Sequence, residues 1–115
     1  MKSDSEIRYD FQQAIRKAEE LESVASNLKR LSNSELENSL QSLAGAWKGE
    51  AARAYLAKGN RLQEKILENA RKLEATARTI RSMAQKTYDA EMAAWRIAKE
   101  REYKLSLAKN NGTLV

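Results

Sequence analysis

The sequence contains no cysteine, no histidine and no proline among its 115 residues. Without cysteine the chain has no disulfide and no thiolate nucleophile, and the redox compartment stays open. Without histidine it lacks the most frequent general base and the most frequent zinc ligand. The sequence therefore predicts a protein that is not an enzyme, with no catalytic residue, no metal site and no cofactor.

Glycine is rare, and long apolar runs are missing. Two of the only four glycines, Gly45 and Gly49, enclose Trp47. Because glycine costs about 1 kcal/mol relative to alanine inside a helix, residues 44–49 are the predicted turn between two helices. No run of 18 apolar residues occurs, so we expect no membrane-spanning helix. Residues 1–6 are polar and lead into no apolar segment, which predicts no cleavable secretory signal.

The net charge of +5 is unevenly distributed. Residues 1–50 carry seven Lys/Arg and nine Asp/Glu, whereas residues 51–115 carry fourteen and seven. The opposite net charges of the two halves favour their pairing across a hairpin. The alternative is a basic face for nucleic acid or anionic lipid. Acidic residues interrupt the basic ones throughout, as at Lys65/Glu68 and Arg71/Glu74, so we expect helix-surface ion pairs and no nucleic-acid partner.

The first half of the chain has the heptad periodicity of a packed helix. Its apolar positions, spaced by four and three, are Ile7, Phe11, Ala14, Ala18, Leu21, Ala25 and Leu28. A second run contains Leu36, Leu40, Leu43 and Trp47, offset by one residue from the first. Ser32/Glu35 and Ser34/Glu37 have the spacing of capping boxes. Two interpretations stay open: a skip within one continuous helix, or a break near Ser32–Ser34.

The second half has the same spacing over a longer stretch. We call the line of residues that packs against the other helix the seam. The predicted seam of this half contains Ala52, Tyr55, Gly59, Leu62, Ile66, Asn69, Leu73, Thr76, Ile80, Met83 and Thr87. Glycine on the seam at Gly59 indicates close approach of the two backbones. Asn69 is either partly exposed or a buried residue that fixes the register.

The second helix is predicted to be longer than the first. Counting the residues of a first helix over 5–43 from Glu50 ends at Tyr88. Residues 89 to about 108 would then overhang by roughly 30 Å, at about 1.5 Å per residue. We expect the overhang to leave Met92, Trp95 and Ile97 without cover from their own hairpin. A partner would have to cover them.

The predicted fold is all-α. It is a single helical-hairpin domain over residues 1–115, with helix 1 about 5–43, a turn at 44–49, helix 2 about 50–108 and a flexible tail at 109–115. Two helices bury only one stripe each, so we expect two hairpins to dimerise into a four-helix bundle. The residues assigned to the partner interface are Phe11, Leu21, Leu28, Gly59, Leu62, Ile66, Leu73, Ile80, Met92 and Trp95.

Trp47-Lys48-Gly49 forms a W-x-G tripeptide at the predicted turn, followed by the small-residue run Glu50-Ala51-Ala52-Arg53-Ala54-Tyr55. Over about residues 5–95 the chain resembles the WXG-motif family of small type VII secretion proteins, the early-secreted-antigen-like helical hairpins. The resemblance implies a dimer that leaves the cytoplasm without a cleavable signal peptide and is delivered to a membrane-bound secretion ATPase. It makes Trp47 and Gly49 the turn motif. Trp47 either plugs the bundle end or forms a recognition surface with the partner's export signal.

The family's C-terminal export signal, Tyr-x-x-x-Asp/Glu, is degenerate here. Tyr88 stands in the right region, but Met92 occupies the acidic position, and Asp89 and Glu91 miss the register. Two interpretations follow. The chain is a partner that targets a larger protein, such as the helical N-terminal domain of an LXG-type toxin, or it is a divergent substrate that uses Tyr88 with Asp89 or Glu91. Whether the dimer pairs two copies or two different chains stays open. Outside the resemblance, the alternatives are an intracellular coiled-coil adaptor and, less favoured, a basic nucleic-acid-binding helical protein.

Overall fold

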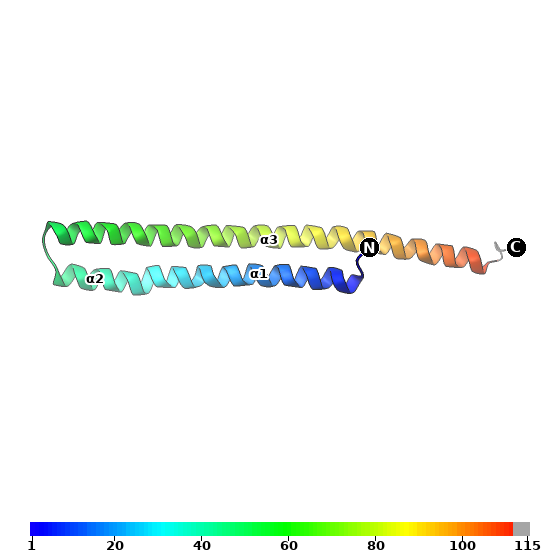
Figure 1. Ribbon diagram of the computed structural model, residues 1–115, viewed down its shortest axis with the longest axis horizontal. Coiled ribbons are helices and arrows are strands. Elements are labelled where there is room, and N and C mark those ends of the chain that lie inside the picture. Colours follow the sequence, from blue (N-terminus) through cyan, green and yellow to red (C-terminus); the bar gives the residue numbers. More distant parts are fainter. Residues whose placement is uncertain (112–115) are drawn as a thin grey trace. The chain divides into compact units, whose positions relative to one another are not determined.

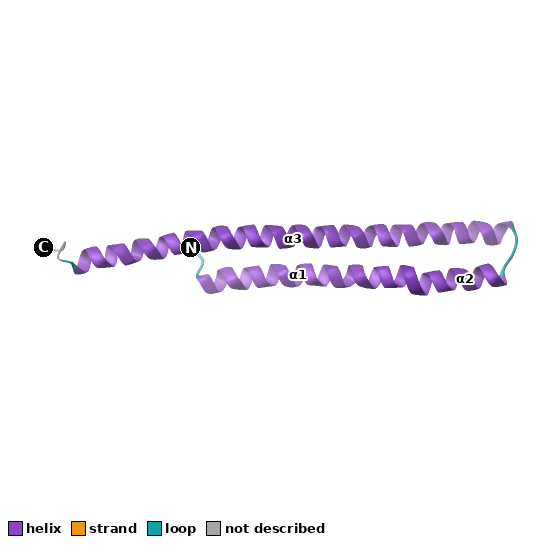
Figure 2. Cartoon of the chain, turned by 180° about the vertical axis from the view of Figure 1, so that it is seen from behind, coloured by secondary structure: helices purple, strands orange, loops and turns teal. Residues whose placement is uncertain are grey.

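A computed structural model describes residues 1–111, and these are helical except at the N-terminus, at one turn and at Asn111. The elements are α1 (Asp4–Arg30), a π-helical turn η1 (Leu31–Leu36), α2 (Glu37–Ala46) and α3 (Glu50–Asn110). No strand occurs within these residues (Figure 2), so the predicted all-α class is confirmed. None of the described helices combines the length and the hydropathy needed to cross a membrane.

The packing divides the chain into two compact units. The turn unit comprises residues 17–79, where the end of α1, η1 and α2 run antiparallel to the first part of α3 (Figure 1). The terminal unit comprises residues 1–16 with the part of α3 from Ile80 onward. The turn unit is therefore a helical hairpin closed by the W-x-G tripeptide.

The turn is shorter than predicted. α2 continues to Ala46, so Gly45 lies inside a helix and only residues 47–49 are non-helical. The Trp47 N–H donates the last helical hydrogen bond, to the Leu43 carbonyl at 2.9 Å, and the extended backbone of Trp47 then ends the helix. Gly49 has φ +107°, a left-handed conformation that costs glycine nothing. A helix therefore tolerates the first glycine of the segment, while the chain reversal requires the second.

The phase slip after Leu28 is explained by the π-helical turn. The helical path from α1 through η1 to α2 is continuous, so of the two open interpretations the skip is the correct one. A π turn holds one residue more than the repeat expects. Ser32, which is fully buried, carries the seam from Leu28 to Leu36 with spacings of four and four. The sequence pattern missed Ser32 because it is polar, although its position follows from the spacing.

A polar cluster surrounds this turn. The Ser32 Oγ donates to the Gln63 carbonyl at 3.2 Å, and the Gln63 Nε2 donates to the Ser32 carbonyl at 3.1 Å. The same Nε2 donates to Glu37 Oε2 at 2.6 Å, and Gln41 Nε2 donates to Glu37 Oε1 at 3.0 Å. A buried polar group costs free energy unless it is hydrogen-bonded. The cluster therefore fixes Gln63 of α3 opposite Ser32.

The cluster predicts an acid dependence of stability. Hydrogen bonds from Gln63 and then Gln41 lower the pKa of Glu37 below its ordinary value of 4.5. A lowered pKa stabilises the folded state above the ordinary value, and this contribution is lost as the pH falls through the folded pKa. We expect the free energy of unfolding, measured by urea denaturation at pH 7 and pH 3, to fall less in Glu37→Gln than in the wild type. Glu35→Gln, at an exposed carboxylate in η1, is the matched control. An identical fall in Glu37→Gln and Glu35→Gln would contradict the role of the cluster.

The predicted seam of the second helix is half wrong. In the turn unit, Ala52, Gly59, Ile66 and Leu73 lie on the seam as predicted. The alternate members Tyr55, Leu62, Asn69 and Thr76 are exposed, and the residues that follow them take their places: Leu56, Gln63, Ala70 and Ala77. At the last two of these positions the structure packs alanine in place of Asn69 and Thr76, and alanine lets the two helices approach closely.

Alanine forms most of the buried core of the turn unit. Its most buried apolar residues are Ala18, Ala25, Ala52, Ala70 and Ala77, each at most 1% exposed. At Gly59 even a methyl group would collide with the side chain of Leu40. Close contact through small residues buries little apolar area for each residue. The hairpin seam is therefore narrow, and larger side chains remain at its edges.

In the terminal unit, Ile7 and Met92 form the buried core. The rings of Phe11 and Tyr88 lie 5.0 Å apart. The expectation that the overhang leaves Met92 uncovered is wrong, because its own chain buries it to 4% exposure. The first helical stretch begins at Asp4 and ends at Ala46, where residues 5–43 were expected, which moves the end of the count from Tyr88 to Met92. Trp95 is half-buried and Ile97 is exposed.

The C-terminal part of α3 also differs from the prediction. Residues 101–110 are all exposed and helical. Lys109 and Asn110, expected in a flexible tail, belong to α3. The rest of the predicted tail, residues 112–115, lies outside the described residues.

Candidate functional site

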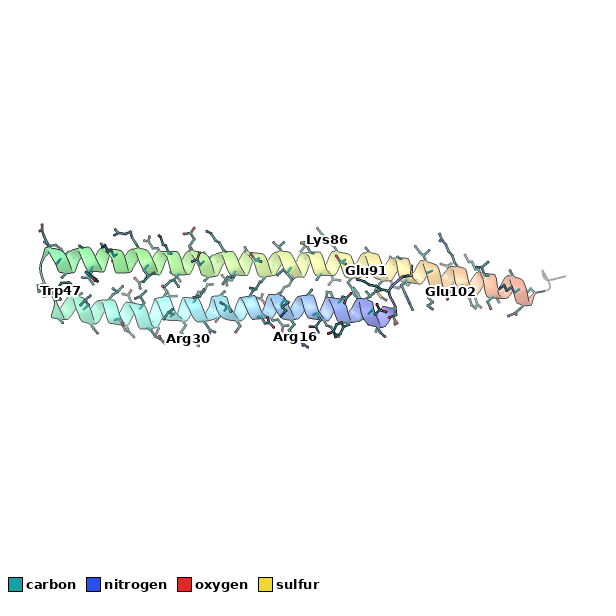
Figure 3. All side chains as sticks on the ribbon, in the orientation of Figure 1. Arg16, Arg30, Trp47, Lys86, Glu91 and Glu102 are labelled. Atoms are coloured by element: carbon teal, nitrogen blue, oxygen red, sulfur yellow. The ribbon has the colours of Figure 1, made fainter. Side chains whose placement is uncertain are left out.

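The turn presents two aromatic side chains. Trp47 is 39% exposed and Tyr55 is 62% exposed, with ring centroids 5.6 Å apart. Figure 3 shows Trp47 at the turn between α2 and α3. Large aromatic side chains usually contribute to the core of a protein. This pair is partly exposed, and aromatic residues are enriched in protein interfaces.

One side of the turn unit is polar. On α1, Lys29 follows the seam residue Leu28, and on α3 Glu74 follows Leu73. Their side chains meet at 2.9 Å. In an antiparallel pair of helices, rotation in the same sense brings both side chains to the same side of the seam. The Lys29–Glu74 ion pair therefore marks this polar side.

The other side carries exposed apolar residues. Val24 in α1 and Leu31 in η1 each precede a seam residue, and Tyr55 and Leu62 each precede one of α3, so all four turn away from the polar side. Their exposed fractions are 47%, 40%, 62% and 50%. We call these four residues the apolar flank. An apolar surface of this kind on one side of a hairpin is a candidate site for another protein.

An aromatic W-x-G turn joins two antiparallel helices whose seam is narrow. A family model described as proteins of 100 residues with WXG matches residues 6–98. The chain belongs to the WXG100 family. No curated protein and no solved structure matches it. The resemblance inferred from the turn and the heptads is confirmed, and this WXG100 protein is a small helical protein associated with type VII secretion.

The residues of the degenerate export signal are held in the terminal unit. Tyr88 is half-buried, and its ring contacts that of Phe11. Glu91 pairs with Lys2 at 3.2 Å, and Lys2 also pairs with Asp10 at 2.9 Å. Hydrogen bonds to these two carboxylates, the larger effect coming from Asp10, raise the pKa of Lys2. Asp89 is exposed and accepts a hydrogen bond from Gln85 Nε2 at 2.9 Å.

The residues assigned to the partner interface fall into different environments. Leu62 is half exposed on the apolar flank, whereas Met92 is buried by its own chain. Gly59 contacts Leu40 inside the hairpin. Half-buried positions are Phe11, Leu21, Leu28, Ile66, Leu73, Ile80 and Trp95. Leu62 is therefore the assigned residue most available to another chain, and Tyr55 with Val24 and Leu31 joins it.

The described residues contain no cluster of three Asp or Glu side chains placed to hold a metal ion. In the terminal unit an open cavity of about 320 Å³ has an apolar lining that includes Ile7, Phe11, Ile80 and Met83. Met83 is 63% exposed at its edge. The cavity is therefore open to solvent and mostly apolar.

Proposed function

We propose that this WXG100 protein is a non-enzymatic type VII secretion substrate or targeting partner that acts as one half of a four-helix bundle. Residues 1–115 work as one helical-hairpin domain in this proposal. The observation that carries it is the apolar flank. A hairpin whose core is mostly alanine leaves Leu62 and Tyr55 half exposed or more, and a second hairpin would bury them.

Within that function we favour the targeting partner over the self-sufficient substrate. The export signal is degenerate in sequence, and the contacts of Tyr88 with Phe11 and of Glu91 with Lys2 support the view that these residues serve their own unit. The second hairpin would then supply the full signal. The helical N-terminal domain of an LXG-type toxin is the partner that we propose, and the complex would be delivered to the secretion ATPase without a cleavable signal peptide.

Export tests the function. The full chain is expressed together with an LXG-type toxin in a host that has a type VII system. We expect the chain to reach the culture medium. It should stay in the cells when the secretion ATPase is inactive or the toxin is deleted. Export without the toxin would favour the substrate interpretation, and retention in every background would contradict the proposed function.

Substitution of the turn tryptophan separates recognition from packing. Trp47 contacts Tyr55 and is 39% exposed at the end of the hairpin, so its loss leaves the alanine seam in place. We expect Trp47→Ala to reduce export or partner binding about tenfold while the helical circular dichroism and the thermal midpoint change little. Tyr103→Ala, at an exposed aromatic residue elsewhere on α3, is the control. A fall in helicity in proportion to the loss of export would show that Trp47 is only a plug.

A further inference from the structure

A row of lysines runs beside the exposed stripe of α3. Tyr55, Leu62, Asn69 and Thr76 recur every seven residues and are exposed. Lys58, Lys65 and Lys72 each follow one of the first three members by three residues, and all three are exposed. A step of three residues turns by 300°, so each lysine lies next to the stripe on the side away from the hairpin seam. We call Lys58, Lys65 and Lys72 the lysine rim.

The rim is open to new ion pairs. Lys72 pairs with Glu68 at 3.3 Å, with both side chains at least 60% exposed. Among residues 1–111, no ion pair involves Lys58 or Lys65. In the sequence the spacing continues with Met83 and Lys86, which repeat the order apolar then lysine. Charged residues that flank an apolar stripe at heptad spacing choose the partner of a helix in coiled-coil packing.

We propose that the stripe and the lysine rim bind an amphipathic helix of another protein that carries acidic residues every seven positions along its apolar face. This inference rests on the proposed function and names the chemistry of the partner in that bundle. Glutamate or aspartate at heptad spacing would face one rim lysine in each turn of the repeat. Asn69 and Thr76 make the far part of the stripe polar, so charge and not apolar area selects the partner there.

A second copy of the chain fits the rim poorly. Stacking α3 on α3 places lysines against lysines. Stacking α3 on α1 places them against the outer edge of α1, where Lys17 and Glu20 already pair with each other at 3.4 Å. The net charge of +5 also opposes self-association. Charge complementarity therefore favours an acidic partner over a homodimer.

The test uses two synthetic helical probes of about 28 residues with the same apolar heptad positions. One probe has Glu at every flanking position and the other has Lys. We expect fluorescence anisotropy to show that the full chain binds the Glu probe about tenfold or more tightly than the Lys probe, since three rim pairs each contribute modestly. The preference should shrink at high salt. Equal binding of the two probes overturns the inference.

Charge reversal of the rim provides the matched comparison. The triple variant Lys58→Glu/Lys65→Glu/Lys72→Glu should reverse the preference toward the Lys probe. The triple variant Arg53→Glu/Arg71→Glu/Arg78→Glu makes the same change in charge at exposed residues that each follow a seam residue, on the polar side of the hairpin, and should keep the preference for the Glu probe. Equal effects of the two variants would show that only net charge matters, which overturns the proposal.

Two further outcomes keep the inference and the proposed function distinct. If the charge-reversed rim unfolds, Lys58→Gln/Lys65→Gln/Lys72→Gln replaces it and should abolish the preference. Light scattering of the full chain alone reports self-association, and a stable dimer that binds neither probe makes a second copy the occupant and overturns the inference. A chain that is exported in an ATPase-dependent manner yet has no probe preference retains the proposed function and loses this inference.

Discussion

Deletion of Asn33 is expected to leave the protein folded, with a free energy of unfolding within about 1 kcal/mol of the wild type. Asn33 is exposed in the π-helical turn η1, Leu31–Leu36. The turn contains one residue more than a regular helix needs there, so its loss converts η1 into α-helix. Ser32 stays on the seam, and Leu36 and Leu40 return to the regular spacing of three and four.

Deletion of Ser23 is the matched control, because this residue is also exposed but lies in regular α-helix. Its loss rotates the following residues by about 100° and carries Ala25 and Ser32 off the seam. We expect a loss of about 2 kcal/mol or more and a thermal midpoint lower by roughly 10 °C, measured by circular dichroism. If the two deletions destabilise the protein equally, the π turn does not contain an extra residue that the helix can lose.

Ala77→Glu is expected to unfold the turn unit or to cost at least about 3 kcal/mol, because an uncompensated charge enters a closed seam. Ala77 is fully buried on α3. A loss of this size is a large part of the 5–15 kcal/mol that stabilises an ordinary domain. Urea denaturation followed by circular dichroism measures it.

Ala75→Glu makes the same change two residues earlier, at an exposed position of the same helix. We expect an effect within about 0.5 kcal/mol of the wild type. The pair of variants tests the corrected seam, since the sequence pattern had placed Thr76 between them on the packed face. Equal destabilisation by both variants would show that Ala77 does not lie in the seam.

Long-period features were accessible to sequence reasoning. The heptad from Ile7 to Leu28 is buried or half-buried throughout, and the all-α class follows from it. The W-x-G turn was recognised from glycine, because Gly49 needs a left-handed φ that other residues rarely adopt. These features depend on local backbone preferences and on a heptad repeat that is visible in the sequence.

The second-helix seam was less accessible. Leu62 and Gln63 are neighbours, and hydrophobicity alone assigns the leucine to the core. The structure instead places the half-buried Gln63 on the seam, where its amide donates to the Ser32 carbonyl and to Glu37. The lysine rim was also overlooked, although the spacing of Lys58, Lys65 and Lys72 by seven residues was available as a signal.

The sequence by itself determined the helices, the turn at Trp47–Gly49 and the membership of the WXG100 family, because heptad spacing and glycine chemistry act along the chain. Only the tertiary structure decided which side of α3 faces α1. That choice depends on how closely two backbones approach, and alanine with Gly59 permits a contact that Leu62 and Tyr55 would prevent. The same choice leaves the large apolar side chains and the lysine rim exposed for another protein.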